Sequence, residues 1–157
     1  MVSQLPAPSS SGVSRRMSRQ RCRDTAPELS IRKLLHARGH RYRVTWPIPG
    51  LPRRTVDVAF TRSRVAVFID GCFWHSCPQH KTSPSANGEW WSEKLRANQL
   101  RDAATTAHLE ALGWSVLRIW EHEIPADAVT RIVELLSERR AALGPKNQHP
   151  SPPSVLS

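Results

Sequence analysis

Short apolar runs along the chain predict the strands of a sheet. Residues 65–69 are apolar and rich in β-branched side chains, which indicates a strand buried on both faces. Residues 56–60 and 115–120 have a similar character, and residues 42–45 form a shorter candidate strand. Three prolines and a glycine lie within residues 46–52, which is typical of a turn-rich connection.

Apolar residues at helical spacing predict three helices. The first begins after Thr25 and Glu28, which have the spacing of a capping box, and ends before Gly39. The second is expected over residues 89–112 and the third over residues 126–143, each with one apolar face. Strands and helices together indicate an α/β domain.

Polar residues interrupt the apolar face of the second predicted helix. At about 3.6 residues per turn, one stripe of this helix consists of Trp91, Leu95, Asn98, Asp102, Thr105 and Leu109. Asn98 and Asp102 in such a stripe either line a site, satisfy buried backbone groups or pair with an arginine. Asp57 and Asp70 are predicted to lie close to this stripe, and their carboxylates favour the first interpretation, a lined site.

Asp57 stands among the apolar residues of a predicted strand. An ionised carboxylate in that environment is costly unless it is paired or bound to a cation. If residues 61–64 form the turn of a hairpin, Asp57 comes close to Ile69 and Asp70 on the next strand. Carboxylates and a main-chain carbonyl then converge at one edge of the sheet.

Sulfur and imidazole groups cluster directly after the apolar run at 65–69. Cys72, Cys77 and His80 lie within one short loop, a spacing that is typical of a tetrahedral zinc site. His122 follows the last predicted strand and is the candidate fourth ligand. A disulfide or simple burial of the two cysteines is the alternative, although the cysteine total of three is odd.

Charge indicates a polyanionic partner. The chain has 23 Lys and Arg against 13 Asp and Glu, a formal net charge of +10. Nucleic acid is the natural candidate, and an anionic membrane surface is the alternative. Five arginines cluster around Met17, namely Arg15, Arg16, Arg19, Arg21 and Arg23. They form either an arm that follows phosphates or a solvated charge run.

Composition also bounds the folded part of the chain. Its 157 residues suffice for one domain with its own core. Residues 1–14 and 144–157 are rich in Ser and Pro and are expected to be disordered tails. We therefore expect one domain over residues 15–143, with the basic arm at its N-terminus. No apolar run is long enough to span a bilayer, and we expect no membrane association.

Residues 67–75, followed by Cys77 and His80 and then by residues 114–122, resemble the very short patch repair endonucleases. The resemblance extends over residues 17–123. It implies a restriction-endonuclease-like fold, with a central mixed sheet flanked by helices and a structural zinc. It also implies a Mg²⁺-dependent endonuclease, which nicks duplex DNA 5′ to the thymine of a T:G mismatch. Such mismatches arise from deaminated 5-methylcytosine.

The resemblance also implies roles for single residues. The hydrolytic site it implies consists of Asp57 as Mg²⁺ ligand, the Ile69 main-chain carbonyl, His75 as general base, and the acids Asp102 and Glu28. The zinc ligands it implies are Cys72, Cys77, His80 and His122. The residues it implies as DNA-intercalating are Phe73, Trp74, Trp91 and Met17. For the aromatic residues, ordinary core packing is the alternative.

The sequence departs from the best-known members of that family at three positions. Ile69 and Asp70 stand where those members carry Thr and His, and His122 stands where they carry Cys. Exchange of a thiolate for an imidazole preserves zinc chemistry. Asp70 either joins the metal coordination or changes the preferred cation, and its role stays open. No lysine follows an acidic residue at the spacing of ordinary restriction nucleases, which favours His75 as the base.

The leading hypothesis is therefore a mismatch-directed nicking endonuclease of DNA repair. One alternative is another site- or structure-specific endonuclease on the same fold, and a second is a zinc-stabilised DNA-binding protein without catalysis. The expected partner is double-stranded DNA with a T:G mismatch, and a mismatch-repair protein is a further candidate. We expect a monomer in the cytoplasm, associated with the nucleoid.

Overall fold

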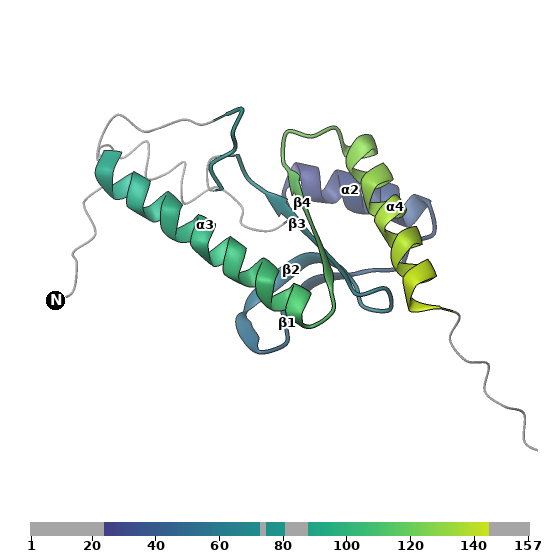
Figure 1. Cartoon of the computed structure of the whole chain (residues 1–157). Helices are drawn as coiled ribbons and strands as arrows, with labels where there is room; N and C mark the ends of the chain where they lie inside the picture. The colour runs from purple at the N-terminus through teal and green to yellow at the C-terminus, as the bar shows by residue number, and fades with distance from the viewer. Residues whose placement is uncertain (1–23, 73–74, 81–87, 145–157) are drawn as a thin grey trace, which may run out of the picture.

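The computed structural model describes residues 24–72, 75–80 and 88–144. Along the chain the elements are α2 (Ala26–Ala37), β1 (Arg43–Ile48), β2 (Leu51–Phe60), β3 (Val65–Asp70), α3 (Gly88–Ala111), β4 (Ser115–Trp120) and α4 (Pro125–Leu143), as Figure 1 shows. The predicted basic arm, Met17, Phe73, Trp74 and most of both predicted tails lie outside the described residues.

The strands form one mixed sheet. Within the described residues its order is β1-β2-β3-β4, with antiparallel pairing of β1 with β2 and of β2 with β3. The hairpin between β2 and β3 has Phe60 opposite Val65, which confirms the expected turn at residues 61–64. β3 and β4 are parallel, and α3 makes the long crossover that parallel neighbours require. A central mixed sheet flanked by helices is thus confirmed.

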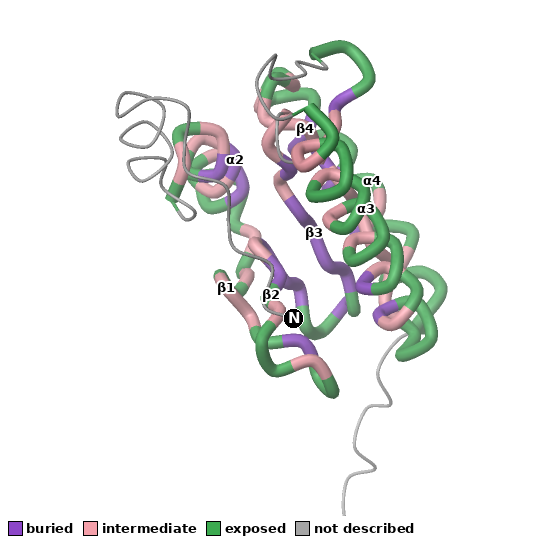
Figure 2. Tube along the Cα trace, turned by 90° about the vertical axis from the view of Figure 1, so that its left-hand side faces the viewer, coloured by how far each residue is buried: buried purple, intermediate pink, exposed green. Residues whose placement is uncertain are grey.

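Each face of the sheet has its own apolar core. Val65 and Val67 of β3 pack with α2 and α4 on one face, whereas Ala66 and Phe68 pack with Leu109 of α3 on the other. This alternation follows from the period of two along a strand. β3 is buried along almost its whole length, and Figure 2 shows it between the other elements. The predicted strand buried on both faces is confirmed.

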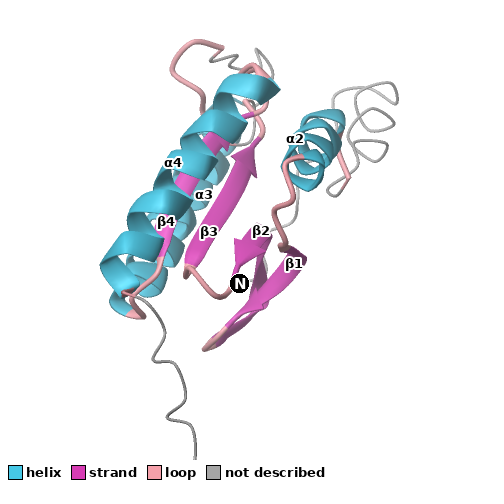
Figure 3. Cartoon of the chain, turned by 90° about the vertical axis from the view of Figure 1, so that its right-hand side faces the viewer, coloured by secondary structure: helices cyan, strands magenta, loops and turns pink. Residues whose placement is uncertain are grey.

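The connection predicted over residues 46–52 is wrong. β1 continues to Ile48 and β2 begins at Leu51, so that Pro49 and Gly50 alone form the turn. Figure 3 shows β1 at the edge of the sheet. An edge strand tolerates proline because one side of it forms no ladder hydrogen bonds. Gly50 has a φ of +81°, a conformation that glycine adopts without steric cost.

The predicted helices agree with the structure to within a residue or two. At the start of α2, Glu28 accepts hydrogen bonds from the Asp24 N–H (2.9 Å) and from the Thr25 hydroxyl (3.1 Å). The Glu28 side chain therefore reaches back as in a capping box, but the Thr25 side chain does not bond to the helix backbone. In the described part of the chain, no helix is long and apolar enough to cross a membrane.

Candidate active site and metal centre

Two thiols and two imidazoles from distant parts of the chain converge at the carboxyl ends of β3 and β4. The ligand atoms of Cys72, Cys77, His80 and His122 all lie within 4.8 Å of one another. His122 Nδ1 lies 3.0 Å from the Cys72 sulfur and 3.7 Å from the Cys77 sulfur. His80 Nδ1 lies 3.8 and 3.7 Å from the same two sulfurs. The parallel pairing of β3 with β4 explains why His122 meets the cysteine loop.

These distances fit a tetrahedral zinc ion. Zn–S bonds of about 2.3 Å and Zn–N bonds of about 2.0 Å at tetrahedral angles place sulfur and nitrogen about 3.5 Å apart. Cys77 is fully buried. The pKa of the Cys72 thiol is raised to about 11, first by its own burial and then by the neighbouring Cys77 thiol. Adjacent thiols of this kind ionise readily only beside a cation, which lowers their pKa. The four side chains therefore could hold a metal ion, and their donor atoms suit zinc.

The loop that carries these ligands is held by its own backbone and by one carboxylate. The Cys77 N–H donates to the Cys72 carbonyl (3.0 Å), and the Cys72 N–H donates to Glu121 Oε1 (2.7 Å). The Glu121 N–H donates to the Asp70 carbonyl (3.0 Å). Glu121 was not among the site residues predicted from the sequence. Its position directly before His122 was the only signal available.

Asp57 lies on β2 beside the end of β3. Its Oδ2 accepts a hydrogen bond from the Ile69 N–H at 2.8 Å, as the predicted hairpin requires. Burial is the largest influence on this carboxyl, and the charges of Glu28 and Asp70 add to it. The Ile69 N–H acts in the opposite direction. The net effect raises the pKa of Asp57 from 3.8 to about 6. A divalent cation bound beside such a carboxyl group stabilises its ionised form.

His75 and Asp102 form a hydrogen-bonded pair. His75 Nδ1 lies 2.5 Å from Asp102 Oδ2. Because an ionised carboxylate can only accept, Nδ1 carries the proton, and Nε2 of the neutral ring is left to act as a base. Burial lowers the pKa of His75, but the Asp102 hydrogen bond and the charges of Asp70 and Asp102 outweigh it, so the pKa lies above its ordinary value. His75 is not part of the Cys/His cluster.

Asp102 reaches this pair from the polar stripe of α3. Burial tends to raise the pKa of Asp102, but the hydrogen bond and charge of His75, followed by the charge of Arg118, lower it below its ordinary range. Its carboxylate therefore stays ionised beside the imidazole. Thr105 and Leu109 of the same stripe are buried, whereas Trp91, Asn98 and Asp102 are half-buried. The stripe is therefore the less exposed face of α3, and it is buried only toward the C-terminal end of the helix.

Arg118 is a site residue that the sequence analysis missed. Its Nη1 lies 2.9 and 2.8 Å from the two carboxylate oxygens of Asp70, and its Nη2 lies 3.7 Å from Asp102 Oδ1. A guanidinium therefore lies between Asp70 and Asp102 and offsets the repulsion between their two negative charges. The available signal was a charged residue within an otherwise apolar strand.

Glu28 lies close enough to Asp57 to help raise its pKa. Both of its carboxylate oxygens accept hydrogen bonds at the start of α2, as described above. Glu28 is 9% exposed and is among the few charged side chains buried in the described residues. The structure thus places Glu28 near the candidate site while engaging it in helix capping.

Of the predicted DNA-intercalating residues, Trp91 lies within the described part of the chain. It is half-buried on α3, and its ring packs against Trp90 edge to face, with centroids 4.8 Å apart. The N-terminal half of α3 extends beyond the sheet (Figure 1). Phe73, Trp74 and Met17 lie outside the described residues.

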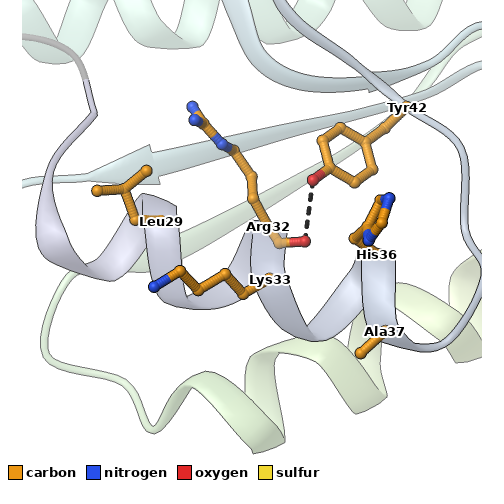
Figure 4. Close-up of a pocket in the computed structure, with 6 residues that line it drawn as sticks. All are labelled: Leu29, Arg32, Lys33, His36, Ala37 and Tyr42. Atoms are coloured by element: carbon orange, nitrogen blue, oxygen red, sulfur yellow. Dashed lines mark hydrogen bonds between the residues drawn. The ribbon is translucent and has the colours of Figure 1, made fainter.

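A separate hollow lies on the outer face of α2, away from this chemistry. It has a volume of about 300 Å³ and is lined by Leu29, Arg32, Lys33, His36, Ala37 and Tyr42 (Figure 4). The Tyr42 hydroxyl donates to the Arg32 carbonyl at 2.9 Å across it. None of the predicted site residues lines this hollow, and we assign it no role in the chemistry.

Comparison with known proteins identifies the relatives of this chain. The family described as DNA mismatch endonuclease Vsr matches residues 9–82. The type II nicking enzyme V.NaeI of Lentzea aerocolonigenes is 45% identical over 134 residues, which cover 83% of this chain and 80% of that protein. V.XorIIP of Xanthomonas oryzae, a type II nicking enzyme, is 37% identical over 111 residues, 69% of this chain and 78% of that protein. The DNA mismatch endonuclease Vsr of Escherichia coli is 39% identical over 102 residues, 63% of this chain and 62% of that protein. The resemblance noted in the sequence is thereby confirmed, and the chain belongs to the Vsr family of DNA mismatch endonucleases.

Proposed function

We propose that this protein is a DNA repair endonuclease that nicks one strand of duplex DNA 5′ to the thymine of a T:G mismatch. The observation that carries the proposal is the placement of Asp57 beside the His75–Asp102 pair at one edge of the sheet. This arrangement supplies a carboxylate suited to a cation and an imidazole suited to a proton. The names of the relatives, nicking enzymes and a mismatch endonuclease, support the same reaction class.

Asp57 and the Ile69 main-chain carbonyl are the groups proposed to hold a Mg²⁺ ion. When bound, Mg²⁺ offsets the charge of the scissile phosphate and polarises one of its oxygens. The donor chemistry fits, because magnesium prefers oxygen ligands and usually takes only one or two carboxylates from the protein. The raised pKa of Asp57 means that cation binding releases a proton around pH 6.

His75 is proposed to act as the general base. Asp102 holds its Nδ1–H, so that Nε2 is directed away from Asp102 and can take a proton from the attacking water. Asp102 also stabilises the imidazolium that forms. Glu28 is proposed to act indirectly, since its charge raises the pKa of Asp57.

The Cys72, Cys77, His80 and His122 cluster is proposed to hold a structural zinc. Four protein ligands leave no open coordination position for a substrate, which is typical of a closed structural site. The ion would tie the loop after β3 to the end of β4. That loop carries His75, so a structural zinc would also fix the position of the proposed base. We further infer that the mixed sheet and its helices represent a restriction-endonuclease-like fold.

Single-turnover nicking of labelled duplexes tests the proposal. The panel contains T:G, the other mismatches and fully paired DNA in several flanking sequences, with zinc-loaded protein and with or without Mg²⁺. We expect Mg²⁺-dependent nicking of one strand, 5′ to the thymine, and none by Asp57→Asn protein. Nicking of paired DNA at equal rate would indicate a different site- or structure-specific endonuclease. DNA binding without any nicking would indicate a non-catalytic zinc protein.

A further inference from the structure

Asp70 is a buried carboxylate at the end of β3 whose role the sequence left open. It is 5% exposed, and both of its oxygens are taken by Arg118 Nη1, at 2.9 and 2.8 Å. Its separation from His75 Nδ1 is 3.8 Å, too long for a hydrogen bond. In the parallel pairing of β3 with β4, Arg118 lies opposite Phe68, which is two residues before Asp70 and on the same face of the sheet. The guanidinium is therefore the direct partner of Asp70.

Arg118 also contacts α3. Its Nη2 donates to the Asp102 carbonyl at 3.3 Å, and its Nε donates to the Thr106 hydroxyl at 3.4 Å. The guanidinium lies over the Phe68 ring, 4.7 Å from the ring centroid. One planar cation thus joins β3, β4 and the turn of α3 that carries Asp102. Guanidinium geometry suits this task because its donors are fixed in one plane.

These contacts separate the carboxylates by role. Asp57 accepts one hydrogen bond, from the Ile69 N–H, and its pKa is raised. A bound cation would therefore stabilise its ionised form. Asp70 already has a full positive charge at hydrogen-bond distance on both oxygens, so a metal ion there would compete with Arg118. The Arg118 side chain is only 26% exposed, so solvent screens its charge weakly. The guanidinium therefore also repels a metal ion that approaches Asp70.

We propose that Arg118 is a positioning residue, anchored by Asp70, which holds the Asp102–His75 pair in place and keeps Asp70 out of the metal coordination. The proposal rests on the proposed function, since the metal and the base are those assigned above. It deepens that function by stating which carboxylate faces the metal and which does not. An ion pair that served the fold alone would affect neither cation affinity nor the chemical step.

Cation affinity is the first test, and it needs no DNA. Mn²⁺ binding to zinc-loaded protein is measured by calorimetric titration for wild type, Asp70→Asn, Arg118→Met and the double variant. We expect Asp70→Asn to weaken binding by less than about tenfold, because that carboxylate is not a ligand and only its charge, which offsets Arg118, is lost. Arg118→Met should bind at least about fivefold tighter, since an unpaired carboxylate then becomes available and a positive charge is lost. The double variant should return to near wild-type affinity.

Single-turnover nicking at saturating cation is the second test. Arg118→Met should slow the chemical step by about ten- to a hundredfold, because a loss of alignment at a reacting centre has effects of that size. Arg131→Met is the matched control. It removes an arginine of α4 that pairs with Glu123 of the preceding turn, and it should leave both measurements unchanged. Arg118→Lys keeps the charge and loses the donors to the Asp102 carbonyl and the Thr106 hydroxyl, and it should regain wild-type cation affinity but only part of the rate.

The outcomes are separable. Weaker Mn²⁺ binding by Asp70→Asn, by tenfold or more, would make Asp70 a metal ligand and overturn the proposal. A wild-type rate in Arg118→Met, with wild-type nicking intact, would overturn the positioning role. An inactive wild type refutes the proposed function instead, and the Mn²⁺ titrations still decide whether Asp70 is a ligand. Melting temperature and zinc content establish folding, and if Arg118→Met does not fold, Arg118→Lys decides the rate comparison.

Discussion

The charge of Asp57 should limit the stability of the protein when no Mg²⁺ is present. Burial, followed by the charges of Glu28 and Asp70, raises the pKa of this carboxyl from 3.8 to about 6, against the effect of the Ile69 N–H. A carboxyl whose pKa is higher in the folded protein favours folding while it is protonated. Its stabilising contribution is fully present below about pH 4 and is lost as the pH rises through about 6.

The size of this effect follows from the shift. Since one pKa unit corresponds to about 1.4 kcal/mol, the upper bound is about 3 kcal/mol. Asp57 is half-buried, so solvent screening reduces the expected value to on the order of 1–2 kcal/mol. Asp57→Asn removes the charge and keeps an oxygen that can accept the Ile69 N–H. We therefore expect the variant to melt about 3 to 8 °C higher than wild type at neutral pH.

Thermal melting followed by circular dichroism, from about pH 5 to about pH 8, measures this difference. The buffer contains neither magnesium nor a chelator, because a chelator would remove zinc. The gap between variant and wild type should widen as the pH rises, and added Mg²⁺ should stabilise the wild type alone. Asp127→Asn, at an exposed position on α4, is the control and should show no such gain. A variant that melts at or below wild type at neutral pH, or a gap independent of pH, would refute the reasoning.

Three further results are expected. His75→Ala should slow single-turnover nicking by roughly two to four orders of magnitude and keep its zinc, and zinc loss would move His75 into the metal cluster. Asp102→Asn should lower the plateau rate and move the rising limb of the pH–rate profile to lower pH, because His75 loses the hydrogen bond and charge that raise its pKa; an unmoved limb would exclude this coupling. Cys77→Ala should yield a poorly folded, zinc-deficient protein by calorimetry and metal analysis, whereas a native melting curve would count against a structural zinc.

The local pattern of apolar and polar residues was enough to predict most helices and strands and the register between β2 and β3. The apolar run at residues 65–69 predicted β3, and helical periodicity predicted α3 and α4 to within a residue or two. The tight turn after Phe60 then placed Asp57 beside Ile69, which the hydrogen bond between them confirms. These features depend on neighbours within about 20 residues, where side-chain period and turn length leave few alternatives.

The loop ligands of the Cys/His cluster were equally local, since Cys72, Cys77 and His80 are close in sequence. The proposal of His122 as their partner needed β4 to lie beside β3, and the structure shows that parallel pairing. The boundaries of β1 and β2 could not be read in this way. Prolines that normally break strands are tolerated at Pro47 because β1 lies at the edge of the sheet, and only the strand order reveals an edge.

The partners of charged groups were decided by the tertiary structure alone. Arg118 and Asp70 are 48 residues apart, and Asp102 reaches His75 from a helix that crosses between two strands. Which carboxylate receives the guanidinium depends on the parallel register of β3 with β4 and on the packing of α3 over that face. Sequence period assigns a side chain to a face of its own element, whereas a long-range ion pair requires the relative placement of three elements.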